Sequence, residues 1–389
     1  MKENEIYCDW AATALFDKEI MENALKTQIE CNGNPSSAHE FGHRAKKILE
    51  ESRKKAARAL GVNEKSIFFT SGGTESNHLV ITNLLLRPNK GSIVISNIEH
   101  PAIREMAENM KKCGWKVISC KCDSNGIVRS ESVIKAIEDD TALVCVMAVN
   151  NEVGSIQPIY EIADALVEKC KGRKKPKFHV DCVQAAGKIP LDLSHKGIDS
   201  ASFSAHKIGG SRGIGILYIS DNAQESFLKG GGQENGIRSG TENLFGIVTM
   251  AESLEKYFFK SEKDEFYKRY EKQKAYSAQF IDTLKQIPGF SLIPETRESF
   301  DERFSPWVIQ CAINKIPGEV MVRALSEKGI YISTGSACSS RKMKRPILQA
   351  MGVKPELLEA GVRFSFGFAT TESQMQTVAE QVKKIAAMF

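Results

Sequence analysis

Two kinds of hydrophobic pattern alternate along the chain from residue 17 to about residue 250. Apolar residues recur at helical spacing in five stretches: Lys18–Glu30, His43–Leu60, Glu75–Leu86, Ala102–Lys112 and Ile159–Lys169. Short apolar runs lie between them: Ser66–Thr70, Ile93–Ile95, Val117–Ile118, Ala142–Val149, Phe178–Val180 and Gly215–Tyr218. This alternation predicts an α/β domain around a mostly parallel sheet. Runs without polar alternation indicate strands that are covered on both faces.

The pattern changes after residue 240. A long helical pattern from Thr241 to Glu255 passes into a charged helix from Glu262 to about Gln286, and we expect these helices to bridge two domains. Beyond Pro288 the expected elements are the strands Phe290–Ile293, Trp307–Ile313, Ile330–Ile332 and Val362–Phe366 and the helices Gly318–Lys328 and Glu372–Met388. This mixture predicts a smaller α+β domain.

Composition narrows the class of protein. The chain has 389 residues, a two-domain length, and a formal charge of +5, which is too thinly spread to indicate direct nucleic-acid binding. The most apolar stretches, Leu79–Leu86 and Ala142–Val149, fall far short of the roughly 18 residues of a membrane helix. Because Met1–Glu5 carries acids and leads into no apolar segment, we expect a cytoplasmic, reducing location. The ten cysteines are then thiols.

A glycine-containing turn follows the first predicted strand, in the sequence Thr70-Ser71-Gly72-Gly73-Thr74-Glu75. Free backbone N–H groups at a helix start bind anions, and Gly72 and Gly73 would let a phosphate approach the backbone. A simple threonine-capped helix fits the same residues. Neither the dinucleotide-binding glycine motif nor a Walker-type motif occurs in the chain, which counts against those nucleotide sites.

Two further motifs carry candidate chemistry. The apolar strand Phe178–Val180 ends in Asp181, at the edge where open α/β sheets bind ligands, and this carboxylate could pair with a protonated ring nitrogen or cap the next element. Lys207 lies among small and hydroxyl residues and is followed by Gly209 and Gly210. This setting suits a nucleophilic or Schiff-base-forming amine, although most lysines are solvated surface charges.

Taken in order, these motifs resemble a known family. The matching residues are Asn34–His39, Thr70–Asn77, Glu99-His100, Asn150–Gly154, His179–Asp181 with Gln184, Ser204–Lys207, Gly230–Glu234, Arg238–Asn243 and Gly335–Ser339. They resemble the NifS/IscS-type cysteine desulfurases, pyridoxal-phosphate enzymes of the class-V aminotransferase type. The resemblance runs from Tyr7 to the C-terminal helix. It implies the fold type I of pyridoxal-phosphate-dependent transferases, in which a large domain (14–255) has a mostly parallel seven-stranded sheet and a smaller α+β domain comprises 1–13 and 256–389.

The resemblance also implies roles for individual residues. Lys207 would hold pyridoxal 5'-phosphate as a Schiff base, Asp181 would pair with its ring nitrogen, and Gln184 would bind its ring oxygen. His100 would stack on the ring and move protons. The phosphate would be bound by Gly73, Thr74, Ser204 and His206, and by Thr241 from the neighbouring subunit of a homodimer. Asn151 and Arg363 would hold the substrate carboxylate. No metal ligand set is implied.

The segment around Cys338 separates a desulfurase from an ordinary aminotransferase. Its small residues, Thr334 to Ser340, indicate a mobile loop that lets one thiol reach the substrate and then an acceptor. The resemblance implies that the Cys338 thiolate attacks the sulfur of L-cysteine, so that alanine leaves and a persulfide remains. Arg341 and Lys342 would favour the thiolate. The basic residues from Arg341 to Arg345 would steer an acidic acceptor, such as an iron–sulfur scaffold protein, or form a solvated loop end. Cys145, Cys182 and Cys311 are expected to be packing residues.

Three positions depart from the family pattern: Trp10 in place of asparagine, Cys182 in place of a small residue, and Phe368 in place of a basic residue. Trp10 and Phe368 could alter the channel or the acceptor side. Two alternatives remain open at this point. One is a selenocysteine lyase or another class-V aminotransferase, and the other is a non-catalytic sulfur-transfer scaffold. Intact Lys207, Asp181, His100 and Cys338 argue against the scaffold.

Overall fold

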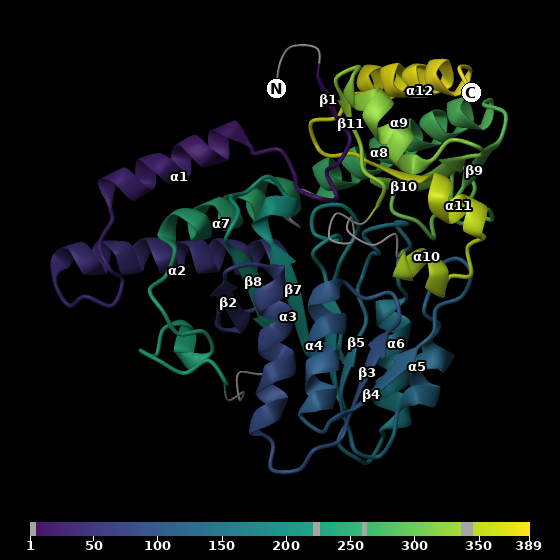
Figure 1. Ribbon diagram of the computed structural model, residues 1–389. Helices are drawn as coiled ribbons and strands as arrows, with labels where there is room; N and C mark the ends of the chain where they lie inside the picture. Colours follow the sequence, from purple (N-terminus) through teal and green to yellow (C-terminus); the bar gives the residue numbers. More distant parts are fainter. Residues whose placement is uncertain (1–4, 221–225, 259–262, 336–344) are drawn as a thin grey trace.

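The computed structural model describes residues 5–220, 226–258, 263–335 and 345–389, and Figure 1 shows their arrangement. A seven-stranded sheet forms the larger part, with strand order β2-β8-β7-β6-β5-β3-β4. Its strands are β2 (Ile67–Thr70), β3 (Ser92–Ser96), β4 (Lys116–Cys120), β5 (Thr141–Cys145), β6 (Lys177–Asp181), β7 (Ser200–Ser204) and β8 (Gly215–Ile219). All neighbouring pairs are parallel except those of β8, which runs antiparallel to both β2 and β7. The predicted α/β class and the mostly parallel seven-stranded sheet are confirmed.

Helices cover both faces of this sheet, as the apolar strand runs indicate. Val94 of β3 belongs to one hydrophobic cluster, and Ile93 and Ile95 on either side belong to another. β2, β5 and β8 show the same alternation, because successive side chains of a strand point to opposite faces. The flanking helices are α1 (Lys18–Glu30), α2 (Glu40–Leu60), α3 (Gly73–Thr82), α4 (Pro101–Lys112), α5 (Ser130–Ala136), α6 (Ile159–Lys169) and α7 (Leu244–Phe258).

A second part of the chain packs around its own sheet, drawn above the main sheet in Figure 1. Its three antiparallel strands have the order β12-β10-β9, and β1 pairs with β11 in parallel beside them. The elements are β1 (Ile6–Tyr7), α8 (Lys263–Lys285), β9 (Phe290–Leu292), β10 (Val308–Ile313), α9 (Gly318–Ser326), β11 (Ile330–Tyr331), α10 (Pro346–Ala350), α11 (Pro355–Ala360), β12 (Gly361–Ser365) and α12 (Glu372–Ala386). Cys8 joins its core. The domain boundaries stay a prediction, and α7 continues through residue 255.

Several predicted elements need correction. The apolar run Ala142–Val149 forms a strand only as far as Cys145, after which the chain turns so that Ala148 N–H donates to Asp181 O and Ala148 O accepts from Gln157 N–H. The helix predicted from Thr241 begins at Leu244, and the helix predicted from Glu75 begins at Gly73. β7 was not expected, because its sequence Ser-Ala-Ser-Phe-Ser is polar and carries little β-propensity.

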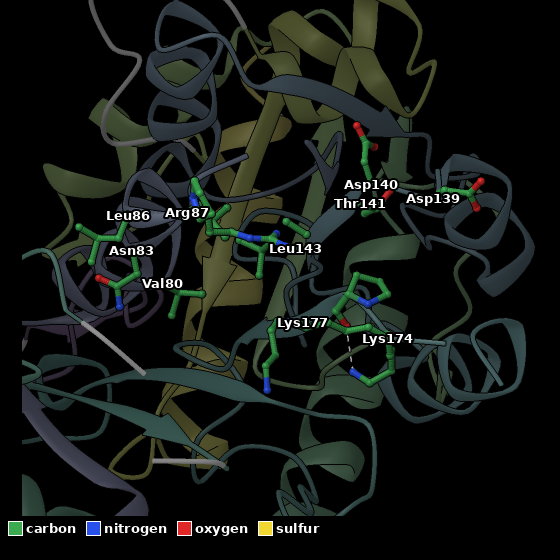
Figure 2. Close-up of a pocket in the computed structure, with 15 residues that line it drawn as sticks. Val80, Asn83, Leu86, Arg87, Asp139, Asp140, Thr141, Leu143, Lys174 and Lys177 are labelled. Carbon is green, nitrogen blue, oxygen red and sulfur yellow. Dashed lines mark hydrogen bonds between the residues drawn. The ribbon is translucent and has the colours of Figure 1, made fainter. Parts of the chain in front are cut away.

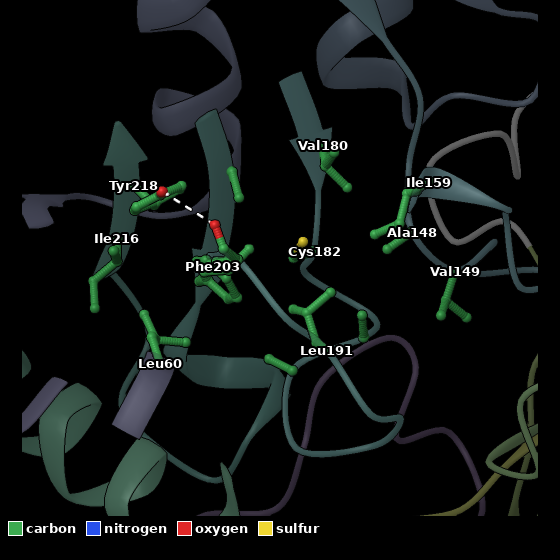
Figure 3. Packing of buried hydrophobic residues seen from close by; sticks show 14 of the residues in the cluster. Leu60, Ala148, Val149, Ile159, Val180, Cys182, Leu191, Phe203, Ile216 and Tyr218 are labelled. Atoms are coloured by element: carbon green, nitrogen blue, oxygen red, sulfur yellow. Dashed lines mark hydrogen bonds between the residues drawn. The ribbon is translucent and has the colours of Figure 1, made fainter. Parts of the chain in front are cut away.

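The three departures from the family pattern lie in packed positions. Cys182 is fully buried among Val180, Leu191 and Phe203, as Figure 3 shows, and burial raises the pKa of its thiol well above the ordinary value. Trp10 packs flat against Gly367, while Phe368 stacks on Tyr257 with ring centroids 4.0 Å apart. These side chains therefore join the N-terminal segment to the end of β12 and to α7.

The contact between Trp10 and Gly367 leaves no room for a side chain. A Cβ at residue 367 would lie 2.0 Å from two carbons of the Trp10 indole. We therefore expect Gly367→Ala to lower the free energy of unfolding by about 1–3 kcal/mol, the usual cost of overpacking. In a Trp10→Asn background the same alanine should cost clearly less. Urea unfolding of the four proteins measures both values. An equal cost in the two backgrounds would contradict the assigned contact.

Candidate active site

The predicted site residues gather at one edge of the main sheet. Asp181 is the last residue of β6, Ser204 is the last residue of β7, and His100 follows β3 by four residues. Because β3, β5, β6 and β7 are parallel, their carboxyl ends meet at this edge. Nearby charges link the residues further: Asp181 and Lys207 both act on the pKa of His100.

The Asp181 carboxylate is held in place by two hydrogen bonds. Asn77 of α3 donates its Nδ2 to Oδ2 at 2.8 Å, and Val183 N–H donates to Oδ1 at 3.0 Å. The Asn77 Oδ1 atom accepts from His179 Nε2 at 2.8 Å and from the Ser202 hydroxyl. His179 Nδ1 lies 2.8 Å from Ser200 Oγ, which therefore donates to it. The carboxylate is thus fixed by a buried network from three elements.

The protonation state of His179 determines which atoms of this network donate and which accept. Burial lowers the pKa of His179 to about 3, so the ring is neutral at physiological pH. A neutral ring that donates through Nε2 to Asn77 must accept at Nδ1, which matches the hydroxyl of Ser200. Asn77 lies in the Thr70–Asn77 motif, but the sequence predicts no role for it. Its hydrogen bond to Asp181, a residue 104 positions away in sequence, is seen only in the folded chain.

The amine of Lys207 lies against the N-terminal segment. Lys207 Nζ donates to the carbonyl oxygens of Ala11 at 2.5 Å and Ala12 at 2.7 Å. The side-chain amide of Gln184 donates to the same Ala11 oxygen at 2.8 Å, so Gln184 and Lys207 share one acceptor. These carbonyl groups could not be predicted from the sequence, since a backbone acceptor carries no side-chain signal.

His100 caps α4 and is kept neutral. Its Nδ1 accepts from Ala102 N–H at 3.1 Å, so Nε2 carries the remaining proton of the neutral ring. Burial lowers the pKa of His100, the Asp181 charge opposes this shift, and the Lys207 and Arg104 charges add to it. In this tautomer the ring offers Nε2–H as a donor, and a second proton goes to Nδ1 only with loss of the Ala102 hydrogen bond.

The start of α3 has the properties of an anion site. Gly72 caps this helix with φ +151° and no side-chain hydrogen bond, while a Cβ on Gly73 would lie 2.6 Å from Val183. Ser204 is in contact range of Gly72, and burial lowers the pKa of His206 to about 4, so its ring is neutral. Backbone N–H groups, a hydroxyl and an imidazole together form a donor set that fits a phosphate.

Arg363 of β12 holds the other side of the site. Its Nη2 donates to Asp9 Oδ1 at 2.6 Å, and its Nη1 donates to the carbonyl oxygens of Asn151 at 2.9 Å and Gly335 at 2.7 Å. Among the described residues, the buried Arg363 Nε and Asn151 Oδ1 have no hydrogen-bond partner. The free Nε donor and the guanidinium fit a carboxylate ligand, while the Asn151 amide would bind one through its Nδ2 donor rather than through Oδ1. Asp9, 354 residues away in sequence, was not predicted as its partner.

Glu99 is a second buried acid that received no role from the sequence. Its Oε1 accepts from Met147 N–H at 2.8 Å and from the Ser96 hydroxyl. Burial raises the pKa of Glu99 to about 8, and the Asp181 charge adds to this effect. The residue is therefore protonated at neutral pH, which leaves Asp181 as the negative charge of the pair.

Three predicted positions are not joined to this group within the described chain. Thr74 and Thr241 are exposed, and no described hydrogen bond links the side chain of either to another predicted site residue. Cys338 lies outside the described residues, as do Arg341 to Lys344. The segment that carries Cys338 begins directly after Gly335, whose carbonyl binds Arg363.

The basic residues between α6 and β6 belong to another part of the molecule. Lys174, Lys175 and Lys177 line a cavity of about 410 Å³ at the amino ends of β5 and β6, opposite the predicted site (Figure 2). Arg173 pairs with Asp139, and Lys175 and Lys177 pair with Asp199. The cavity lining also includes Arg87, Asp139 and Asp140, so basic residues outnumber acidic ones, and several of the charges are already paired.

The described residues contain neither a candidate metal site nor a candidate membrane-spanning helix. No three or more His, Cys, Asp or Glu residues there are grouped as metal ligands. Likewise, none of the described helices has the length and apolar character needed to cross a membrane.

Comparison with known proteins places the chain in a family. The class-V aminotransferase model matches residues 6–378. The cysteine desulfurase IscS of Methanosarcina thermophila is 36% identical over 98% of this chain and 91% of its own length. Among solved structures, a NifS-like protein has a TM-score of 0.89 at 33% identity, covering 99% of this chain and 100% of that one. The structure of SspA in complex with cysteine has a TM-score of 0.78 at 29% identity, covering 93% and 98%. The chain belongs to the class-V aminotransferase family, among the NifS/IscS-type cysteine desulfurases.

Proposed function

We propose that this protein is a cysteine desulfurase that converts L-cysteine to L-alanine and retains the sulfur on Cys338 as a persulfide. The observation that carries the proposal is the meeting of the Lys207 amine, the fixed Asp181 carboxylate and the neutral His100 at one sheet edge, in a chain that matches such an enzyme over 91% of that enzyme's length. The relative that was solved with cysteine supports the substrate.

The residues at the sheet edge fit pyridoxal 5'-phosphate. Lys207 would hold it covalently, Asp181 would keep its ring nitrogen protonated, and Gln184 would donate to its ring oxygen. The N–H groups at Gly73 and Thr74, with Ser204 and His206, would bind the phosphate, and Thr241 of a second subunit would complete this site in a homodimer. When bound, this cofactor delocalises the electron pair released as the substrate Cα–H bond breaks.

Arg363 and Asn151 are proposed to bind the carboxylate of L-cysteine. The guanidinium is a rigid, always charged fork that matches a carboxylate with two hydrogen bonds. Asp9 would keep Arg363 paired and oriented in the absence of substrate, because an unpaired buried guanidinium is costly. The substrate would then lie with its carboxylate next to Gly335.

Cys338 is proposed to take the sulfur. Its thiolate attacks the substrate sulfur, a new S–S bond forms, and the substrate Cβ–S bond breaks with its electron pair passing to the organic fragment. Protonation of that fragment gives alanine, so L-cysteine and the Cys338 thiol are converted to alanine and the Cys338 persulfide. His100 would carry a proton between substrate and site, with its Nε2–H group as the donor.

The remaining parts of the proposal concern partners and place. The persulfide would pass to an acceptor protein, such as an iron–sulfur scaffold, that docks near the basic residues Arg341 to Arg345. A reducing cytoplasm suits an enzyme that works through a thiol, and the nine described cysteines are free. A selenocysteine lyase would use the same groups, so the assay below includes both substrates.

Substitution of Cys338 and Lys207 separates sulfur transfer from cofactor binding. With the cofactor-loaded protein and L-cysteine, we expect alanine from the wild type and a loss of about 10³-fold or more in Cys338→Ala, because the sulfur then has no nucleophile. Lys207→Ala should lack the absorption band of the covalently bound cofactor. A wild type that forms alanine from selenocysteine but not from cysteine would contradict the proposed substrate. Cys311→Ala, at a buried packing position, is the control for thiol loss.

The proton-carrying role of His100 predicts a defined pH dependence. Because burial lowers the pKa of His100 below 6.5, the ring is neutral at pH 7 and gains a proton only on further acidification. Alanine formation should therefore fall only as the pH drops below the ordinary imidazole pKa of 6.5, where the ring gains a second proton and the neutral form is lost. His100→Asn keeps a side chain that caps α4, so its thermal midpoint should stay near the wild-type value while the rate falls by about 10²–10⁴-fold. An unchanged rate at every pH would refute the role.

A further inference from the structure

Lys188 is a buried cation next to the proposed site to which no role has been given. Its side chain is 2% exposed, and its Nζ donates to Gln184 Oε1 at 3.0 Å, the one hydrogen bond of this ammonium among the described residues. The Lys188 carbonyl accepts from Trp307 Nε1 at 2.7 Å, which anchors the backbone at this point. The lysine is therefore held rigidly against a single side-chain partner.

Burying a lysine ammonium at this position is energetically unfavourable. Burial and the nearby charges of Lys207 and Arg363 all oppose the ammonium form, and they lower the pKa of Lys188 to about 7. A methionine or leucine would fill the same space without these penalties. Packing alone therefore does not account for a lysine at this position, and its single partner indicates what the lysine does.

The partner is an amide whose direction matters. A glutamine amide has an oxygen that accepts and a nitrogen that donates, and its two orientations fill almost the same volume. The charged form of Lys188 carries donors and no acceptor, and the neutral form still carries two N–H donors, so the amide oxygen is the group that pairs with it. The amide nitrogen of Gln184 must then face the other way, where it meets the Ala11 oxygen that also binds Lys207.

We propose that Lys188 is a positioning residue that fixes the Gln184 amide with its NH₂ group toward Lys207 and the cofactor. Without Lys188 the amide keeps this direction only through its hydrogen bond to the Ala11 oxygen, and an amide that turns would place its oxygen toward any negatively charged oxygen of the cofactor. This inference rests on the proposed function, because the donor matters only where an anionic group is bound beside Lys207. It adds a fixed direction for the one amide side chain that donates beside the Lys207 amine.

The test uses the cofactor's own signals together with turnover. The variant is Lys188→Met, and the two readouts are the dissociation constant of pyridoxal phosphate for the apoprotein and the pH midpoint of the absorption change of the loaded protein. We expect cofactor binding to weaken about tenfold, because one charge-stabilising hydrogen bond is lost. The pH midpoint should rise by about one unit, since the lost Gln184 donor favoured the deprotonated form.

Further variants identify the route of the effect. Adding Lys188→Met to Gln184→Leu should change neither readout further, because Lys188 acts through this amide. Lys188→Gln is a polar substitute if the methionine protein folds poorly, and it should shift the midpoint in the same direction because glutamine pairs with either amide orientation. The control is Lys175→Met, at the opposite edge of the sheet, which should leave both readouts at wild-type values.

Each outcome bears on one proposal. If both Lys188 variants load the cofactor with wild-type affinity and midpoint, the positioning role is overturned. An additive loss in the Gln184→Leu background would also overturn it, because Lys188 would then act independently of the amide. If the wild type itself neither binds pyridoxal phosphate nor forms alanine, the failure lies with the proposed function instead.

Discussion

The N-terminal segment from Cys8 to Ala14 is the connection on which the candidate site depends. Its Ala11 carbonyl receives hydrogen bonds from both Gln184 and Lys207 on the main-sheet side. The Ala11 N–H group donates to Ser365 Oγ of β12 at 2.9 Å, on the other side. This short N-terminal segment thus contacts residues of both parts of the molecule. The amine that would carry the cofactor is therefore positioned only when the two parts of the molecule are packed together.

Charge balance is the second constraint at this edge of the sheet. Lys207, Lys188 and Arg363 bring positive charge into a partly desolvated region, while Glu99 is neutral because burial raises its pKa to about 8. His179 and His206 are neutral as well, since burial lowers the pKa of each. The carboxylates of Asp181 and Asp9 leave part of the positive charge uncompensated. Such a region favours anionic ligands, a phosphate on one side and a carboxylate on the other.

Local sequence was sufficient where chemistry and secondary structure coincide. Asp181 at a strand end and Lys207 before a glycine pair are local motifs. Most strands and long helices could be predicted from the spacing of hydrophobic residues. The serine-rich strand β7 and the short helices α5, α10 and α11 carry too weak a pattern. The pairs Asn77–Asp181 and Asp9–Arg363 join residues far apart in sequence, so only the folded chain reveals them. Lys188 resembles any surface lysine until its burial is known.

Under the proposed function, Arg363 would connect the binding of substrate to the approach of the Cys338 thiol. Its guanidinium binds the carbonyl of Gly335, the residue from which the Cys338 segment departs, and it also binds Asp9 and the carbonyl of Asn151. A substrate carboxylate that takes the place of Asp9 would share this guanidinium with the base of the segment. The substrate and the start of the Cys338 segment would then both be bound by one rigid guanidinium on β12. A shared rigid binding group reduces the entropy lost in aligning a sulfur nucleophile with its target.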